Sequence, residues 1–360
     1  MAQNVFREVT AGRGIFKAED SLSPEFLPDR LPGRENEERE LAAALESAAR
    51  GGRASNLFIH GPPGTGKTSV CRHVLAQLQE FSGKPLCVYV NCWQHATRQG
   101  VLAQLAQEVG EPLPRRGLAA DEVFTRVCQR LKYDKRVPVV VLDEADRLFI
   151  GSEHAVLYDF SRAAEMFGVH FAIVMVTNDS EMLSRTDGRV RSSLSPKETA
   201  FKAYSPIDLK KILAERASAA FVPGACGDEV IALCAAHGAK AGGDARVALH
   251  ALWLAGKAAE KRGAKAIALE DARTAFSKTG SSAEQKRDRD VELLSEGEKT
   301  VVEMLKAAGG QLTSSEIYAS FEKKGLGSER SVRNYLASLE EKKLAESKTQ
   351  HDGRRLVRLL

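Results

Sequence analysis

Residues 57–68 read LFIHGPPGTGKT, and this stretch decides the fold. Its last eight residues, 61–68, match the phosphate-loop pattern GxxxxGK[ST] in full. The apolar residues 57–60 predict a buried strand, and residues 67–79 have the spacing of a helix. Glycines at such a strand-to-helix turn let backbone N–H groups converge on phosphate oxygens, and the helix points its positive end at them. The stretch therefore predicts an α/β domain that binds a nucleoside triphosphate.

Two side chains at the end of this loop have distinct expected roles. Lys67 is expected to reach the β- and γ-phosphates of ATP, and Thr68 is expected to ligate Mg²⁺. The alternative is a chance glycine-rich turn. The complete pattern, placed between a strand and a helix, argues against that alternative.

Short apolar runs alternate with helical stretches around the loop. Three later runs resemble 57–60 in being apolar on both faces, as strands of a parallel sheet covered by helices on each side must be. They are residues 86–91, 137–142 and 171–176, with a short candidate fifth strand at 200–203. Helical patterns lie at 34–49, 67–79, 101–109, 121–131 and 154–166. The alternation predicts a doubly wound α/β fold, in which helices flank a parallel sheet.

The segments outside this domain differ from it in composition. Residues 1–33 form a leader with three prolines, which predicts extended chain lying on another part of the protein. The α/β domain occupies 34–204. Residues 205–279 carry no strand signal and predict a helical lid domain, with helices at 206–220, 229–237, 244–262 and 269–278.

The end of the chain predicts a third domain. Residues 280–294 are polar and highly charged, which is typical of a linker. Residues 295–360 then show helical patterns at 295–307, 314–324 and 328–343, followed by β-like runs at 344–349 and 354–360. Three helices followed by a hairpin predict a winged helix.

Bulk properties exclude several classes of protein. Lys and Arg outnumber Asp and Glu by 52 to 48, and this weak basic bias permits a nucleic-acid partner without establishing one. The six cysteines form no CxxC pair, which favours reduced, buried thiols over a zinc site or a disulfide framework. No apolar run approaches the roughly 20 residues that span a bilayer, and residues 1–17 lack a signal-peptide core. We therefore expect a cytoplasmic protein without a membrane partner.

Polar residues follow two of the expected strands. Residues 139–146 read VVVLDEAD, so a strand ends in adjacent carboxylates: Asp143 suits a direct or water-mediated contact with Mg²⁺, and Glu144 suits activation of water. Residues 174–179 read VMVTND, and Asn178 is expected to orient the attacking water or to contact the γ-phosphate. A loop-forming Asn-Asp pair is a serious alternative for Asn178.

Arginines at three positions are candidates for contacts with the γ-phosphate. Arg246 begins a lid helix in the segment GGDARVAL and could fold back onto the nucleotide. Arg189 and Arg191 lie in GRVRSSL, from which an arginine could reach the nucleotide of a neighbouring subunit. An isolated arginine is usually only a surface charge, so composition alone assigns neither role.

The motifs together resemble those of the AAA+ superfamily. GPPGTGKT, VVVLDEAD, VMVTND, RVRSSL and GDARVAL occur in the order that the superfamily shows. Within it, the chain resembles archaeal replication initiators of the origin-recognition and cell-division-control type. The narrower resemblance rests on LPGRENE (31–37), RVRSSLSPKETAFKAYS (189–205), GGDARVALHAL (242–252) and the winged-helix-like end. It covers the chain from about residue 27 to residue 360.

The resemblance implies a site for ATP or ADP with Mg²⁺, in which residues 27–34 pack near the adenine. It implies the two sensor roles for Asn178 and Arg246, and the finger role for Arg189. With Lys67, Asp143 and Glu144, these form the expected catalytic set. The expected nucleotide contacts are Leu31, Pro32, Gly33, Arg34, Pro62, Pro63, Gly64, Thr65, Gly66, Lys67, Thr68, Ser69, Tyr204 and Arg246.

DNA contacts are expected at two places. These initiators carry an insertion before the acidic strand that contacts DNA, and residues 110–118, with Arg115 and Arg116, are the candidate; an ordinary exposed basic loop is the alternative. In the winged helix, basic residues outnumber acidic ones by eight to five from residue 328 to the end, a modest excess, and a protein–protein module is the alternative. The expected contacts there are Arg330, Arg333 and Asn334 on the recognition helix and Lys348, Arg354 and Arg355 on the wing.

The expected function is an ATP-regulated replication initiator that binds duplex origin DNA and recruits or loads the replicative helicase. Slow ATP hydrolysis would act as a switch, with a finger supplied by another copy or a paralogue, in the cytoplasm at the nucleoid. One alternative is a signalling NTPase held inactive by its winged helix. Another is a clamp-loader-like or transposition ATPase, which leaves the winged-helix end unexplained.

Overall fold

The computed structural model describes residues 14–112, 117–150, 153, 155–277, 296–308, 311–323, 329–341, 345–349 and 355–359. The chain forms two compact units, residues 1–279 and residues 280–360. The candidate loop at Arg115 and Arg116, the linker and the wing residue Arg354 lie outside the described residues. In the part of the chain that the structure describes, no helix is both long and apolar enough to cross a membrane.

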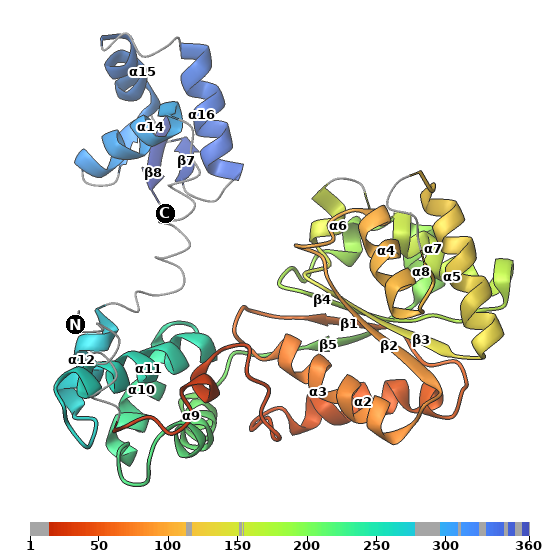
Figure 1. The fold of residues 1–360 in the computed structure, drawn as a ribbon. Helices are drawn as coiled ribbons and strands as arrows, with labels where there is room; N and C mark the ends of the chain where they lie inside the picture. Colours follow the sequence, from red (N-terminus) through yellow and green to blue (C-terminus); the bar gives the residue numbers. More distant parts are fainter. Residues whose placement is uncertain are drawn as a thin grey trace, which may run out of the picture. The chain divides into compact units, whose positions relative to one another are not determined.

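A five-stranded parallel sheet organises the first unit. Its strands are β1 (Leu57–His60), β2 (Pro85–Asn91), β3 (Val137–Asp143), β4 (Ala172–Thr177) and β5 (Lys197–Ala200), in the order β2-β3-β4-β1-β5. Helices cover both of its faces (Figure 1), which confirms the predicted fold class. A fifth strand is present, but its predicted bounds of 200–203 were wrong, because β5 ends at Ala200. It is a mostly exposed edge strand of sequence KETA, so it lacked the apolar signal.

Side chains alternate between the two faces of the sheet. Val139 and Val141 point toward α2 (Glu35–Ala49) and α3 (Lys67–Phe81), whereas Val140 and Leu142 point to the other face. That other face is covered by α4 (Arg98–Glu108), α5 (Ala120–Asp134), α7 (Ala155–Phe167) and α8 (Gly188–Leu194) (Figure 1). Because both faces are buried, the strands read as continuous apolar runs. The short helices α6 (Arg147–Ile150) and η2 (Leu183–Arg185) carry no periodic signal of their own and were not anticipated.

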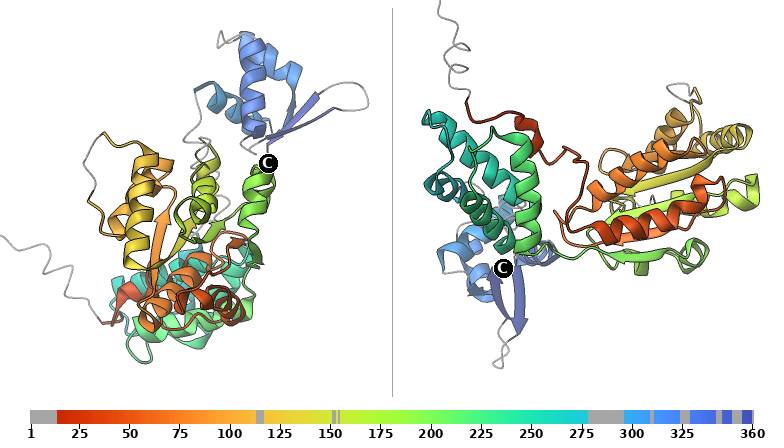
Figure 2. Two further views of the ribbon diagram at one scale, coloured as in Figure 1. Left: turned by 90° about the vertical axis from the view of Figure 1, so that its right-hand side faces the viewer. Right: turned by 90° about the horizontal axis from the view of Figure 1, so that it is seen from below.

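Four helices follow the sheet and share a second core. They are α9 (Pro206–Ala220), α10 (Asp228–Lys240), α11 (Ala245–Lys261) and α12 (Leu269–Phe276). Helix α9 begins at a capping box: Ser205 Oγ accepts from the Asp208 backbone N–H, and the Asp208 carboxylate accepts from the Ser205 N–H. From residue 14 onward, the leader, with η1 (Glu19–Leu22), runs along these helices (Figure 2), and Ile15 and Leu22 are buried in their core.

The second unit is small and has its own core. It comprises α14 (Glu296–Ala307), β6 (Gln311–Thr313), α15 (Ser314–Lys323), α16 (Glu329–Glu341), β7 (Ala345–Thr349) and β8 (Arg355–Leu359). The strands form an antiparallel sheet in the order β6-β8-β7. Leu305, Phe321, Val332, Leu336 and Val357 pack together at its centre. The three helices and the hairpin lie where the sequence predicted them, and the three-residue strand β6 was not anticipated.

Candidate nucleotide-binding site

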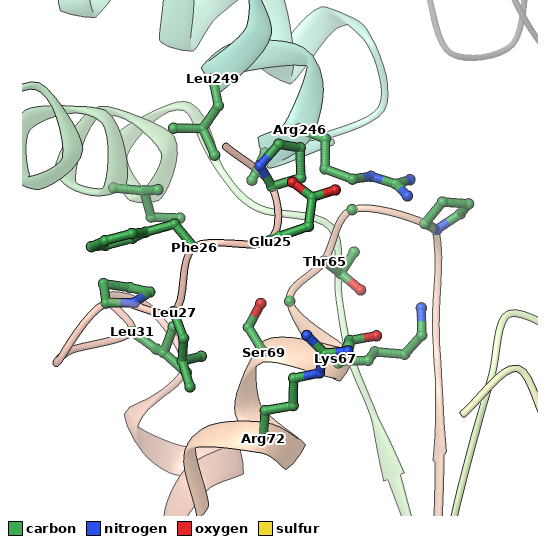
Figure 3. A pocket seen from close by; sticks show the side chains of 18 of the residues that line it. Glu25, Phe26, Leu27, Leu31, Thr65, Lys67, Ser69, Arg72, Arg246 and Leu249 are labelled. Atoms are coloured by element: carbon green, nitrogen blue, oxygen red, sulfur yellow. The ribbon is translucent and has the colours of Figure 1, made fainter. Parts of the chain in front are cut away.

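The carboxyl ends of the strands bring the motif residues together. In the sheet register His60 lies beside Thr177, and Asp143 lies beside Val176. The loop after β1, the carboxylates after β3 and Asn178 after β4 therefore meet at one edge of the sheet. They line a cleft of about 430 Å³, and residues of the leader and the lid line it as well (Figure 3).

The loop approaches the lid too closely for side chains at two of its glycines. Gly64 and Gly66 have φ of 70° and 86°, a region that L-residues rarely adopt. A Cβ on Gly64 would overlap the Asp244 carboxylate, and one on Gly66 would overlap the Tyr204 hydroxyl. The Ala245 N–H donates to the Gly64 carbonyl at 3.1 Å. The glycines thus allow direct contact between the phosphate loop and the lid.

Lys67 is buried at the first position of α3. Its ammonium donates to the carbonyls of Gly61 and Pro62, at 2.7 and 2.8 Å, and to Asn178 Oδ1 at 2.8 Å. Burial lowers the pKa of Lys67 to about 8, against the opposing effect of Glu144 and Asp143. Bound phosphate would favour the charged form of this ammonium. Lys67 and Asn178 therefore lie on the same ligand-facing wall.

Asp143 accepts hydrogen bonds from two hydroxyls. The Thr68 Oγ1 donates to its Oδ2 at 2.7 Å, and the Tyr89 hydroxyl donates to the same atom at 2.5 Å. A threonine hydroxyl beside a carboxylate offers the hard oxygen ligands that Mg²⁺ takes, and Mg²⁺ usually keeps several waters beside few protein ligands. Within the described residues no group of three or more His, Cys, Asp or Glu could hold a metal ion. The pair fits a nucleotide-bound Mg²⁺ and not a metal cage.

Glu144 stands at a strained turn next to Asp143. Its φ is 54°, and the Asn178 Nδ2 donates to its Oε2 at 3.1 Å. Burial raises the pKa of Glu144, and the neighbouring carboxylates of Asp143 and Asp146 raise it further. A more basic carboxylate near phosphate suits the role of a general base toward water. Asn178 is placed to hold both Glu144 and Lys67.

Arg34 lies behind the loop and not on the surface of the cleft. Its Nε donates to the Thr65 carbonyl at 2.8 Å, one terminal nitrogen donates to the Lys202 carbonyl at 2.5 Å, and the guanidinium stacks 4.0 Å from the Tyr204 ring centroid. Arg34 therefore supports the loop from within. Of the expected nucleotide contacts, Gly33, Arg34 and Pro62 are not among the lining residues. The others are Leu31, Pro32, Pro63, Gly64, Thr65, Gly66, Lys67, Thr68, Ser69, Tyr204 and Arg246, and they line the cleft.

The candidate arginines occupy two different environments. Arg246 lines the cleft from the start of α11, where its guanidinium is paired with Asp244 at 2.9 Å and is about half exposed. Arg189 and Arg191 are exposed on α8 and do not line the cleft of their own chain. This placement leaves them accessible to another molecule.

Sequence reasoning missed part of the lining. Most of the missed residues lie outside the motifs, and they include Pro24, Glu25, Phe26, Arg72, Tyr89, Asn91, Trp93, Ile212, Glu215 and Arg216, with Leu249 inside the segment GGDARVAL. Asn91 and Trp93 had a usable signal, because they follow a predicted strand as Asp143 and Asn178 do. The lid and leader residues had none, since only tertiary packing brings them to the loop.

The structure describes most of the residues that are expected to contact DNA in the second unit. Arg330, Arg333 and Asn334 are exposed on α16, on the side away from the buried Val332 and Leu336. Lys348 lies in β7 and Arg355 in β8, where the two residues flank the hairpin turn. The backbone thus places the two groups on different elements of one small unit.

Known proteins similar to the chain were found at the level of sequence and of structure. Residues 49–183 match the family described as AAA domain, and residues 210–277 match the Cdc6 AAA+ ATPase-type lid domain. The ORC1-type DNA replication protein 1 of Sulfurisphaera tokodaii is 37% identical over 283 residues, which cover 78% of this chain and 70% of that protein.

Two solved structures extend the comparison over nearly the whole chain. The Aeropyrum pernix Orc1 protein, solved in complex with DNA, is 33% identical with a TM-score of 0.77, covering 96% of this chain and 94% of that one. The Aeropyrum pernix Orc2 protein, solved with ADPNP and ADP, has a TM-score of 0.72 with the same coverage. At 21% identity the second likeness shows the fold alone.

Proposed function

Because the chain belongs to the family of ORC1-type DNA replication proteins, we propose that it initiates replication by binding duplex origin DNA under the control of bound ATP or ADP. The chain is an AAA+ ATPase and a replication initiator of this type. One combined observation supports the proposal. The complete phosphate-loop motif lines a cleft, and the likeness of the chain to a DNA-bound Orc1 protein covers nearly all of its length.

The nucleotide site acts in this proposal as a slow switch. Lys67 would bind the phosphates, Thr68 and Asp143 would hold Mg²⁺, and Glu144 would activate water that Asn178 helps to orient. The ion supplies charge neutralisation at the phosphates. Arg246 lies on the lid side of the cleft, so its contact with the γ-phosphate would tie the lid to the nucleotide state.

The exposed finger candidates extend the proposal to a second molecule. Arg189, on α8, would reach the nucleotide of a neighbouring copy or paralogue, with Arg191 as the alternative from the same helix. Helicase recruitment completes the proposed role, and the site of action is the cytoplasm at the nucleoid.

The proposed domains follow the chain in order. Residues 1–33 are the leader, residues 34–204 the AAA+ domain, residues 205–279 the lid and residues 280–294 the linker. The second unit is the proposed winged-helix DNA-binding domain.

Binding to a specific duplex tests the origin-binding claim. We expect an origin duplex to bind roughly a thousandfold more tightly than a scrambled duplex of the same length and base composition. The measurement is competition for a fluorescent origin duplex at one fixed salt concentration, because phosphate contacts make affinity strongly salt-dependent. Equal competition by the two duplexes would reject origin specificity while leaving general DNA binding intact.

The wing is tested by removing two of its arginines. We expect the double variant Arg354→Ala with Arg355→Ala to bind duplex DNA more weakly, and the slope of log affinity against log salt to become shallower by about two, since each lost phosphate contact removes roughly one unit. A matched control removes two exposed lysines of the first unit, by Lys202→Ala with Lys211→Ala. An unchanged slope in the wing variant would show that these two arginines make no phosphate contact.

A further inference from the structure

The leader is attached to the lid along most of its described length. Phe16 pairs with Phe221 in a β-bridge, and the N–H groups of Lys17 and Ala18 donate to the Ala220 carbonyl at 2.7 and 3.0 Å. Further along, the Glu19 carboxylate accepts from Trp253 Nε1 at 2.8 Å and from Lys257 Nζ at 2.6 Å. The leader is therefore a part of the lid in its contacts, although it precedes the AAA+ domain in sequence.

The same leader forms one end of the nucleotide cleft. Phe26, Leu27 and Leu31 gather there, and Ile212 and Leu249 line the cleft from the lid helices. Figure 3 shows Phe26, Leu27, Leu31 and Leu249 on the side away from Lys67. Since Lys67 marks the phosphate end, the nucleoside must lie toward this apolar end. Its apolar side chains suit the face of a base.

Arg216 of the lid contacts the leader at the segment that borders the cleft. It is 5% exposed, on α9, and lines the cleft. Its guanidinium donates to the Phe26 carbonyl at 2.9 Å and to the Ser23 carbonyl at 2.6 Å, and it lies 4.7 Å from the centroid of the Phe26 ring. One arginine thus fixes both the backbone and the aromatic ring of the leader segment that borders the cleft.

The buried position of the Arg216 guanidinium is unfavourable for the folding stability of the protein. Burial lowers its pKa to about 10, with Glu215 opposing that effect, and its Nε has no hydrogen-bond partner among the residues that the structure describes. A buried charge usually contributes less to stability than an apolar residue of similar volume would. The leader also keeps its attachments at Phe16, Glu19 and Leu22 without it. Arg216 is therefore not needed to hold the leader on the lid.

We propose that Arg216 is a positioning residue for the nucleoside half of the ligand. By donating hydrogen bonds to the Ser23 and Phe26 carbonyls, it holds the leader segment against which the base lies. The inference rests on the nucleotide site of the proposed function and deepens it. The AAA+ domain holds the phosphates, with Arg246 of the lid reaching the γ-phosphate, and the lid with its leader holds the nucleoside. Nucleotide affinity then depends on Arg216 only through the nucleoside.

Two ligands separate the halves of the site. Binding of ADP and of pyrophosphate, both with Mg²⁺, is measured by titration calorimetry on the full chain and on its Arg216→Gln and Arg216→Lys variants. We expect both variants to bind ADP about tenfold more weakly, since they lose the forked pair of charge-assisted hydrogen bonds. Pyrophosphate affinity should stay within about twofold of the original chain, because no phosphate contact changes.

The controls distinguish positioning from a general loss of structure. Arg262→Gln removes a lid arginine that forms an ion pair with Asp271 and does not line the cleft, so it should change neither affinity. Arg216→Lys keeps the buried charge and answers the question if the Gln variant does not fold. A parallel fall of ADP and pyrophosphate affinity, or no fall of either, would overturn the inference. Failure of the unaltered chain to bind ADP would instead reject the nucleotide site itself.

Discussion

Lys67→Ala is expected to lower the affinity for ATP about a hundredfold or more, because the ammonium would make charge-assisted hydrogen bonds to two phosphates. The loop carbonyls of Gly61 and Pro62, which now accept from this ammonium, can offer no substitute, since an anion is repelled by acceptor oxygens. Titration of the purified chain with a fluorescent ATP analogue measures the effect.

Lys132→Ala provides the matched control for this variant. Lys132 is exposed on α5 and does not line the cleft, so its loss changes the net charge equally and should leave ATP affinity unchanged. Removing the buried ammonium of Lys67 also removes a desolvation cost, so the unfolding temperature without nucleotide should change little. Unaltered ATP affinity in the Lys67 variant would reject the assignment of the phosphate site.

Glu144→Gln is expected to leave ATP binding intact and to slow hydrolysis about a hundredfold or more, the usual contribution of a general base. The amide keeps the size of the side chain and can still contact Asn178, but it cannot take a proton from water. Single-turnover hydrolysis, measured beside ATP titration, separates chemistry from binding and suits an enzyme with slow turnover.

The control for hydrolysis is Glu165→Gln. Glu165 is an exposed residue of α7 whose recorded partner is Arg162, so its change should affect neither binding nor hydrolysis. Undiminished single-turnover hydrolysis by the Glu144 variant would show that another group activates the water. Asp143 is the neighbouring carboxylate, but its Oδ2 is engaged by Thr68 and Tyr89 and its Oδ1 by the Glu144 N–H.

The motifs predicted well which side chains line the cleft around the phosphate loop, because much of this arrangement is local in sequence. A phosphate site needs backbone N–H groups, a helix end and an ammonium in one place. All of these lie within a single strand-loop-helix, residues 57–81, so the sequence spacing alone specifies their geometry. Asp143 and Asn178 could be added because parallel strands end at one edge of a sheet. The edge strand β5 was misplaced by three residues, since an exposed strand of polar residues has no apolar run to mark it.

The sequence by itself determined the doubly wound α/β fold, the order of the helical segments and the motif side chains that line the cleft beside the phosphate loop. Only the tertiary structure decided what forms the other end of that cleft: it docks the leader on the lid and places Arg34 beneath the loop and Arg216 beneath Phe26. Phe26 and Arg216 are 190 residues apart, and their contact follows from the packing of whole helices. Hydrogen bonds to backbone carbonyls require no particular residue at the acceptor, so such contacts leave no pattern in the sequence.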